Sequence, residues 1–382
     1  MKKVLAYLKK ELMLTVSVLA AIAALILTPP SMALLEDIDW KTLAILFMML
    51  TVLEGFKKEN IFRPLLVLSG RMQTMLGLTF FLVFGVFFSS MFVTNDVSLI
   101  IFVPLTILLF RAGDREKFIL PVISMENIAA VRGSMLTPFG SPQNLFLFGQ
   151  SGVSAGEFLL HMAPLWAFSG LLLCLFIRVL YRKEPKMPLG FTPDSVTTPW
   201  APERKTQRVV YLALFAVVLA TIVTRTTLWP FVLAAVVVTV LVFDRKILLK
   251  TDYVLLLTFF CFFVFSSSVA ANPAISGFLK NAVAGREYWW GIGLSQIISN
   301  VPAAIVLWPF TGSLSALLYG VDSAGLVFLI GSLASVINYR IYVREYPGNG
   351  GKFVKYFTLI SLAFFAIVVI PGLLLSRWQF SV

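Results

Sequence analysis

Two polar clusters interrupt long apolar runs of the chain, and their residue types are suited to binding an ion. In the first half, Thr94, Asn95 and Asp96 lie within an apolar run over residues 74–110. Lipid cannot hydrogen-bond backbone groups, so non-helical backbone at membrane depth persists only inside protein or beside a water-filled cavity. A hydroxyl, an amide and a carboxylate at such a break can hold a cation or a proton, while helix N-termini face a bound solute. The alternative is an exposed turn between two ordinary helices.

The second cluster repeats this design without the carboxylate, in an apolar run over residues 288–311. It comprises Ser299, Asn300, Val301 and Pro302. The proline has no backbone N–H, so the returning helix lacks a hydrogen bond near its start. Because Val301 stands where the first cluster has Asp96, we expect the first cluster to be the more cation-seeking or proton-sensitive of the two. The alternative is a plain kink at the Asn-x-Pro sequence.

A further interruption follows the first cluster, inside the apolar stretch 119–149. It comprises Gly140, Ser141, Pro142, Gln143 and Asn144. Glycine allows close backbone approach, proline frees a carbonyl, and the polar side chains add oxygen ligands of the kind that hard cations prefer. This pattern predicts a broken helix that binds a solute, with Na⁺ held at Asn95, Asp96, Ser141 and Asn144. The alternative is a helix that only bends at its prolines.

The matching interruption of the second half lies in the apolar stretch 323–343. Gly331 and Ser332 begin a run of small residues there, and Asn338 adds an amide. These residues either line the same solute site or allow close packing between helices.

Several charged residues lie outside these clusters. Glu126 and Arg132 are about 120° apart on one helix, so they do not pair with each other, and we expect each to have a structural partner elsewhere, although Arg132 could attract an anion. His161, Asp322 and Arg340 lie near the ends of predicted spans, where snorkelling to the interface explains them without a function.

The composition indicates a polytopic membrane protein. Hydrophobic residues make up 59% of the 382 residues and charged residues only 13%, which is more apolar sequence than a soluble core could absorb. The net charge is +12, but the basic residues lie in short loops between apolar runs rather than on one face, so we expect no nucleic-acid partner. Two cysteines in apolar runs and a single histidine argue against a disulfide, a multi-histidine metal centre and a Ser-His-Asp hydrolase.

The apolar pattern predicts an all-α protein with about nine transmembrane spans. These are residues 13–34, 40–55, 119–149, 158–181, 209–227, 229–243, 253–271, 323–343 and 356–376. The two runs that carry the polar clusters are expected to be re-entrant hairpins. With the N-terminus in the cytoplasm and the C-terminus outside, all but six of the 31 lysines and arginines are cytoplasmic. The six are Lys41, Arg132, Arg225, Lys280, Arg286 and Arg377.

An odd connecting span makes the two halves inverted repeats of each other. Residues 1–181 form the first repeat, residues 182–227 a cytoplasmic linker and the connecting span, and residues 228–382 the second repeat. Segments 56–73 and 272–286 mix apolar and basic residues, so we expect interfacial helices that lie flat on opposite faces of the membrane.

The run from Thr94 to Pro104 resembles the ion transporter superfamily, which includes divalent anion/sodium symporters, citrate transporters, arsenite permeases and sodium/proton antiporters. Residues 140–145 look like the Gly-Thr-Pro-Pro-Asn-type motif of the dicarboxylate branch, whereas Asn95-Asp96 and residues 330–335 look more like the arsenite-permease branch. The resemblance implies an elevator-type carrier, often dimeric, with two hairpins and two broken helices around a midplane site. At the positions of Asp96 and Val301, dicarboxylate symporters carry hydroxyl residues that would hold a substrate carboxylate.

The sequence therefore predicts a secondary transporter of the inner membrane, not an enzyme, that moves a small anion or oxyanion coupled to Na⁺ or H⁺. We expect the lipid bilayer as its surroundings, a homodimer, and no cofactor beyond the coupling ion. One alternative is Na⁺/H⁺ exchange at Asp96 without any anion. Two others are an ion channel and a membrane-embedded enzyme, although no motif brings Asp96, Glu126 and His161 together as acid and base.

Overall fold

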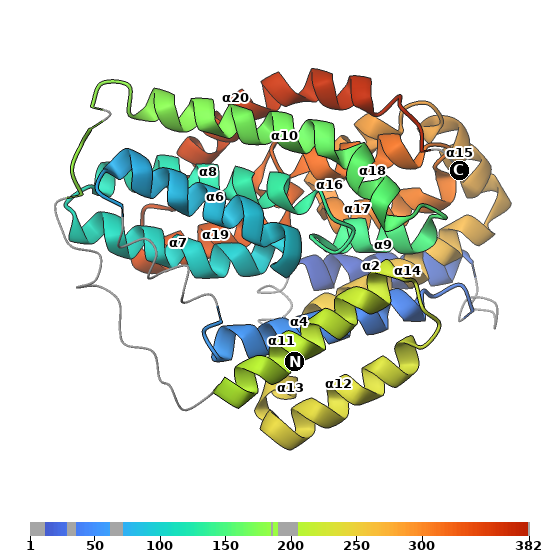
Figure 1. The fold of residues 1–382 in the computed structure, drawn as a ribbon. Coiled ribbons are helices and arrows are strands. Elements are labelled where there is room, and N and C mark those ends of the chain that lie inside the picture. The colour runs from blue at the N-terminus through green and yellow to red at the C-terminus, as the bar shows by residue number, and fades with distance from the viewer. Residues whose placement is uncertain (1–11, 29–35, 62–71, 185, 190–204, 381–382) are drawn as a thin grey trace.

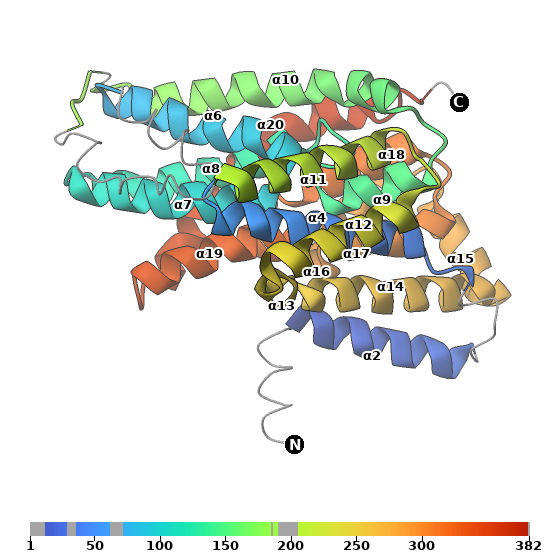
Figure 2. The same cartoon turned by 60° about the horizontal axis from the view of Figure 1, so that its bottom comes forward.

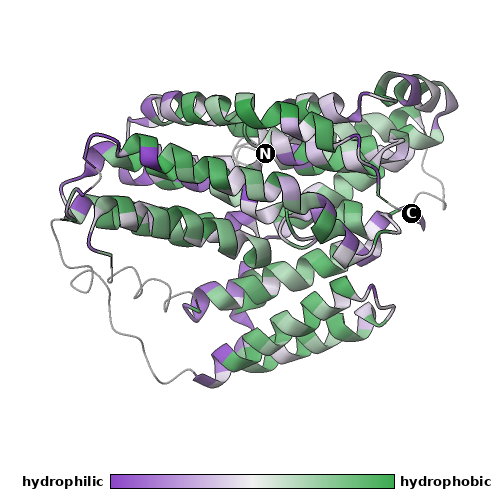
Figure 3. Cartoon of the chain, turned by 45° about the horizontal axis from the view of Figure 1, so that its top comes forward, coloured by the Kyte–Doolittle hydropathy of each residue, from purple (hydrophilic) through white to green (hydrophobic). Residues whose placement is uncertain are grey.

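The computed structural model describes residues 12–28, 36–61, 72–184, 186–189 and 205–380, and this part of the chain is helical without strands. Its helices run nearly parallel, with most connections gathered at two opposite ends (Figures 1 and 2). Six of them are long and apolar enough to cross a membrane. Figure 3 shows hydrophobic residues along the helix bodies and hydrophilic residues concentrated at their ends. The expected all-α polytopic membrane protein is confirmed.

The helices form two groups. The peripheral group lies along the lower side of Figure 1 and comprises α2 (Leu12–Leu27), α4 (Trp40–Lys58), α11 (Lys205–Val223), α12 (Trp229–Asp244), α13 (Lys246–Lys250) and α14 (Tyr253–Ala271). The remaining helices form the bundle, which holds both polar clusters. Large apolar side chains such as Phe231, Val242 and Leu249 are 74–83% exposed on the peripheral group, as expected for a surface that faces lipid.

The bundle contains two equivalent sets of helices. The first set is α6 (Met75–Val93), α7 (Asn95–Ala112), α8 (Ile119–Ser134), α9 (Pro142–Gln150) and α10 (Ala155–Leu180). The second set is α16 (Glu287–Ile298), α17 (Asn300–Leu307), α18 (Leu314–Ala324), α19 (Leu333–Glu345) and α20 (Gly350–Leu375). The two sets cross each other, because α7 packs against α19 and α17 packs against α9.

The helices that precede these sets begin alike. Asp39 caps α4 by accepting a hydrogen bond from Thr42 N at 2.9 Å, and Asp252 caps α14 by accepting one from Leu255 N at 2.9 Å. A carboxylate at the N-cap satisfies a free N–H and complements the helix dipole. Equivalent caps thus mark equivalent places in the two halves.

Some expected boundaries differ from the observed ones. The second broken span begins at Leu314 rather than at residue 323, because α18 follows directly after Gly312 and Ser313 and carries polar residues that disguise it as a loop. Helix α15 (Pro273–Val283) occupies the predicted interfacial segment 272–286, and α4 extends into the segment 56–73. Residues 62–71, and most of the predicted linker 182–208, lie outside the described residues.

Candidate functional site

The two polar clusters adopt the same backbone conformation. Thr94, between α6 and α7, has φ 68° and ψ 153°, and Ser299, between α16 and α17, has φ 71° and ψ 159°. Positive φ is uncommon and strained for residues other than glycine. Each of these residues is followed by an asparagine that starts the returning helix, and Asn95 and Asn300 are both buried. We call these two junctions the tips.

The two helix interruptions also match in conformation. Ser141 has φ −147° and ψ 151°, and Ser332 has φ −149° and ψ 139°, each immediately before the second half-helix starts. The preceding glycines allow the chain to fold back tightly. A Cβ on Gly140 would lie 2.2 Å from Ser134 O, and a Cβ on Gly331 would lie 2.4 Å from Ala324 O. We call these interruptions, residues 135–141 and 325–332, the breaks.

Each tip is held against the break of its own half. Thr137 in the first break donates to Met91 O, three residues before Thr94. In the second half, the Gln296 side chain donates to Ala324 O at 3.1 Å and accepts from Phe328 N at 3.2 Å. Two different sets of side chains therefore produce the same tip-to-break packing.

Asp322 lies on α18, the first half of the second broken helix, and contacts α9, the second half of the first. Gln143 Nε2 donates to Asp322 Oδ1 at 3.0 Å, and the Asn144 amide, oriented to satisfy both its polar atoms, donates to the two carboxylate oxygens at 3.0 and 3.1 Å. The residue is 1% exposed. The expectation that Asp322 snorkels at a span end is wrong, because α18 begins at Leu314 and carries this carboxylate to the interior of the bundle.

Arg132 is the second buried charge at this place. It is fully buried on α8, and its Nη2 donates to Ser323 Oγ at 3.2 Å, while Nε has no partner among the described residues. Its charge lies within electrostatic range of Asp322. Helices α8 and α18 are equivalent in the two halves and end at Ser134 and Ala324. Arg132 and Asp322 each stand two residues before these ends. Equivalent positions in the two halves therefore carry opposite charges.

Asp96 follows the first tip and faces the peripheral group. Its backbone N–H donates to Asn95 Oδ1 at 2.9 Å, and its Oδ1 atom is buried without a partner. The charges of Lys57 and Asp252 lie within electrostatic range. Both residues also line a pocket of about 480 Å³ between α4 and α14. Asp96 therefore lies in electrostatic range of two residues that line this pocket.

The expected partners of Glu126 and the neighbouring amides lie on other helices. Glu126 accepts a hydrogen bond from Thr106 Oγ1 on α7. Asn127 Nδ2 donates to Ser335 Oγ at 3.0 Å, and Asn338 Nδ2 donates to Ile123 O at 2.7 Å, so these amides join α8 to α19. His161 is buried against Ser315 rather than snorkelling, with its ring nitrogen 2.7 Å from Ser315 Oγ.

The predicted site residues fall into two places. Gln143 and Asn144 meet Asp322 at the crossing of the broken helices, whereas no described hydrogen bond links Asn95 or Asp96 to Ser141 or Asn144, the residues expected to share a Na⁺ ion. In the first turn of α17, Val301 and Pro302 are buried, and Pro142 is the first residue of α9. Some of the buried polar atoms without a partner in the protein belong to these predicted residues: Asp96 Oδ1, Ser141 Oγ, Gln143 Oε1 and Asn300 Nδ2.

Sequence reasoning missed Asp322 as a site residue. The available signal was its distance from Gly331, which matches within one residue the distance from Arg132 to Gly140. Aligning the two halves on these glycines places a buried charge at the same point of each, where an intramembrane ionisable residue indicates function.

Comparison with known proteins defines the class. The family model described as "Citrate transporter" matches residues 4–331, so the chain belongs to the citrate transporter family. The inner membrane protein YbiR of Escherichia coli is 33% identical over 313 residues, covering 80% of each chain. An uncharacterized transporter of Methanocaldococcus jannaschii is 29% identical over 336 residues, covering 86% of this chain and 87% of the relative. The protein is thus a multi-pass transporter of the inner membrane.

A solved structure supports the same fold. The YdaH transporter of Alcanivorax borkumensis superposes with a TM-score of 0.53 and 16% sequence identity, covering 90% of this chain and 85% of that one. At this identity the likeness concerns the fold alone.

Proposed function

We propose that the protein is a secondary active transporter that moves a small anion or oxyanion coupled to Na⁺ or H⁺. The observation that carries this proposal is the pair of matched tips and matched breaks, with buried polar atoms around them that have no partner in the protein. Buried polar groups are normally hydrogen-bonded, so such a concentration of unpaired ones marks a place where a solute completes the structure.

The coupling ion is assigned to two carboxylates. Asp322 has oxygen-bearing neighbours in Ser141 and Gln143, whose Oγ and Oε1 atoms are buried and unpaired, and oxygen ligands suit Na⁺. Asp96 offers a second, separate cation or proton site beside the pocket at Lys57. The proposal adds Asp322 to the residues from which the sequence predicts a Na⁺ site, Asn95, Asp96, Ser141 and Asn144.

The anion is assigned to Arg132. Its guanidinium is buried, donates to one hydroxyl and to the Met135 sulfur, and keeps Nε unpaired. A guanidinium is a fixed fork of donors that matches carboxylates and oxyanions. The family name offers citrate as a candidate, but the tips provide Asp96 and Val301 where hydroxyls would be needed, so we propose a smaller anion.

The proposed movement is of the elevator type, in which the bundle slides against the peripheral group. At one end of the molecule, Arg225 at the end of α11 donates to Phe148 O and Val153 O, both at 2.6 Å, and so clamps the end of α9. At the other end, the pocket at Lys57 and Asp252 is lined by residues whose charges lie in electrostatic range of Asp96. With basic helix ends in the cytoplasm, we assign this state as closed on the outside.

Helix length supports re-entry of the second tip. Helices α16 and α17 have 12 and 8 residues, which gives about 18 and 12 Å at 1.5 Å per residue, too short to cross a hydrocarbon core of about 30 Å. Helices α6 and α7 are long enough to cross, but their tip is held against a helix break. We therefore propose two re-entrant hairpins and nine crossings, with the N-terminus in the cytoplasm.

Na⁺/H⁺ exchange is a second candidate, favoured by one observation. Neither Asp96 nor Asp322 has a lysine or arginine nitrogen within 4 Å in the described part of the chain, so both carboxylates can accept a cation directly. In this mechanism Arg132 only balances Asp322 and no anion moves.

Flux measurements in proteoliposomes separate the two candidates. Purified protein is reconstituted, and ²²Na⁺ uptake is followed under an imposed pH gradient, with and without a panel of carboxylates, sulfate, phosphate and arsenite outside. The proposal predicts Na⁺ or H⁺ flux that requires one of these anions. Full exchange in the absence of any added anion would support the antiporter, and saturable counterflow would distinguish a carrier from a channel.

A further inference from the structure

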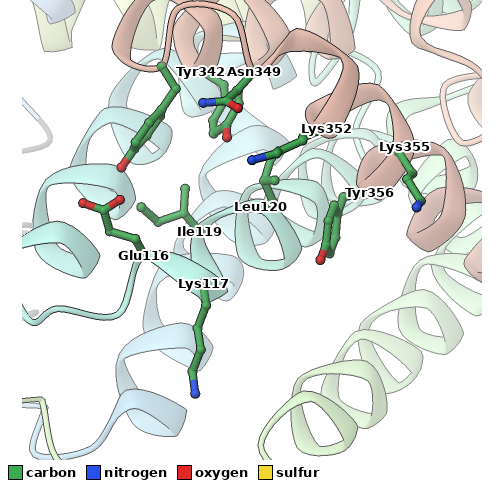
Figure 4. Close-up of a pocket in the computed structure, with 10 residues that line it drawn as sticks. Glu116, Lys117, Ile119, Leu120, Tyr342, Asn349, Lys352, Lys355 and Tyr356 are labelled. Carbon is green, nitrogen blue, oxygen red and sulfur yellow. The ribbon is translucent and has the colours of Figure 1, made fainter.

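A basic and aromatic pocket lies at one end of the bundle, away from the tips and breaks. It forms where the start of α8 meets the end of α19 and the start of α20 (Figure 4). Its volume is about 500 Å³, within the range of small-molecule sites. Ile119 and Leu120 form an apolar floor, and Lys117, Lys352 and Lys355 supply positive charge. We call it the basic pocket.

The lysines of the basic pocket lack acidic partners. None of Lys117, Lys352 and Lys355 has a carboxylate within 4 Å in the described residues. Glu116 is the one acidic residue of the lining, and its carboxylate lies 3.9 Å from Arg111, which also stacks on the lining residue Tyr346 at 5.0 Å. The pocket therefore presents a net positive charge and would attract an anion.

The face of α20 that borders the pocket changes from basic to apolar along its length. Lys352, Lys355, Tyr356 and Leu359 follow the spacing i, i+3, i+4, i+7, so they share one side of the helix. In Figure 4, Lys352 reaches over Ile119 and Leu120, while Lys355 and Tyr356 follow on the next turn. Leu359 is 61% exposed, and Ile370 farther along α20 is 63% exposed. A basic helix start followed by exposed apolar side chains suits a ligand with an anionic headgroup and an apolar chain.

The pocket lies at the end of a candidate membrane span, where a lipid headgroup would stand. Helix α20 is the most hydrophobic candidate span, and Lys352 and Lys355 stand in its first two turns. Exposed Tyr356 and buried Tyr342 stand where interfacial aromatic residues are enriched. Basic pockets between helices at the cytoplasmic surface bind anionic headgroups. A free phosphate ion would use the lysines but leave the apolar face of α20 without a role.

We propose that the basic pocket binds the phosphate of an anionic phospholipid whose acyl chain lies along α20 from Leu359. Because the pocket joins the ends of α8 and α19, a bound lipid connects one half of each broken helix to α20. This site is separate from the transport site and does not depend on the identity of the transported solute.

The test is lipid binding to delipidated protein in detergent micelles, measured by native mass spectrometry. Dioleoylphosphatidylglycerol, dioleoylphosphatidylcholine and inorganic phosphate are titrated separately, and the first is repeated in excess phosphate. The proposal predicts selective retention of the phosphatidylglycerol. Replacing Lys117, Lys352 and Lys355 together by Gln weakens its affinity roughly a hundredfold, since each basic residue near an anionic lipid contributes about fivefold.

The matched control removes three exposed basic groups elsewhere, with Gln at Lys205, Arg245 and Lys246, and keeps the affinity of the wild type. The single variant Lys355→Gln, at an exposed lysine without an ion pair, provides a fallback if the triple variant misfolds, and weakens binding about fivefold. Equal retention of both lipids, equal affinity in the triple variant and the wild type, or displacement of the lipid by inorganic phosphate would each overturn the proposal.

Discussion

The two halves of the bundle share their backbone but differ in charge. Thr94 and Ser299 have nearly the same φ and ψ, as do Ser141 and Ser332, and both breaks are closed by a glycine against the preceding helix end. At matched positions, however, the first half carries Arg132 where the second carries Asp322. The backbone pattern is thus repeated for architecture, while each half supplies a different charge to the space between them.

The two tips also differ in charge. Asp96 gives the first tip a carboxylate, and Val301 gives the second an apolar side chain at the same place. If the halves are equivalent only in backbone, the same glycine substitution at either break should lower stability equally. Substitutions of the charged residues should have different effects in the two halves.

The largest effect is expected at Asp322. Asp322→Ala removes the acceptor of Gln143 and Asn144 and leaves Arg132 as an uncompensated buried charge. A buried polar group left without its hydrogen-bond partner costs about 1–3 kcal/mol, and two amides lose their acceptor here, so we expect a large fall in thermal stability and loss of transport. Asp322→Asn keeps the volume, and we expect it to retain more stability while still losing ion coupling. Transport by Asp322→Asn at the wild-type rate and ion dependence would remove the assigned role.

The glycines of the breaks come next. Gly140→Ala and Gly331→Ala each place a Cβ within 2.4 Å of a backbone carbonyl, which cannot move as a side chain can. We expect a loss of about 3 kcal/mol from either change, measured by thermal or denaturant unfolding. Gly152→Ala and Gly293→Ala are matched controls because a Cβ at those positions meets nothing within 4 Å. A large effect at one break and none at the other would refute their equivalence.

A smaller effect is expected from exchanging the tip residues. Asp96→Val makes the first tip resemble the second, and Val301→Asp does the reverse. If Asp96 binds Na⁺, Asp96→Val raises the half-saturating Na⁺ concentration about tenfold, which corresponds to the loss of one charge contact of about 1.4 kcal/mol. If Asp96 binds H⁺, the variant instead loses the pH dependence of uptake. The measurement is solute uptake at varied Na⁺ and pH. Unchanged uptake between pH 5 and 9 would exclude Asp96 from coupling.

The smallest effect is expected at Arg225, which follows α11 of the peripheral group and donates to carbonyls at and just beyond the end of α9. Arg225→Gln removes its contacts with Phe148 O and Val153 O and should favour opening on the outside. We expect a change of about two- to threefold in uptake rate with little change in stability, because the contact forms in only one of the two states. Lys205→Gln, at the other end of α11, serves as a control. Identical rates for both variants and the wild type would argue against a clamp.

The sequence predicts the repeated tips and breaks, but not which charged side chains are buried between the two halves. Polar breaks within apolar runs are local signals, so the tips at Thr94 and Ser299 and the broken helix at 119–149 follow from the sequence. Asp322 does not, because its burial depends on where α18 begins and on the distant residues Gln143 and Asn144 that meet it. A contact across some 180 residues has no local signature.

The same limit explains the predicted Na⁺ site. Asn95, Asp96 and Asn144 all interrupt apolar runs, and the sequence alone groups them because they have the residue types that bind a cation. In the structure Asn144 donates to Asp322 on α18, while Asp96 lies in electrostatic range of Asp252 in the peripheral group. Which polar residues share a cavity is decided by the crossing of the two halves.

The central claim is that both tips are enclosed within the membrane, and labelling of single cysteines tests it directly. Asn95→Cys and Asn300→Cys are placed in a variant lacking Cys174 and Cys261, and a membrane-impermeant maleimide is added from each side, with Gly152→Cys as the exposed control on the outside. We predict that the control reacts at once from outside, whereas neither tip does, and that Na⁺ slows labelling of Asn95→Cys from the cytoplasm. Rapid and complete labelling of the two tips from opposite sides, unaffected by Na⁺ or anions, would contradict the account.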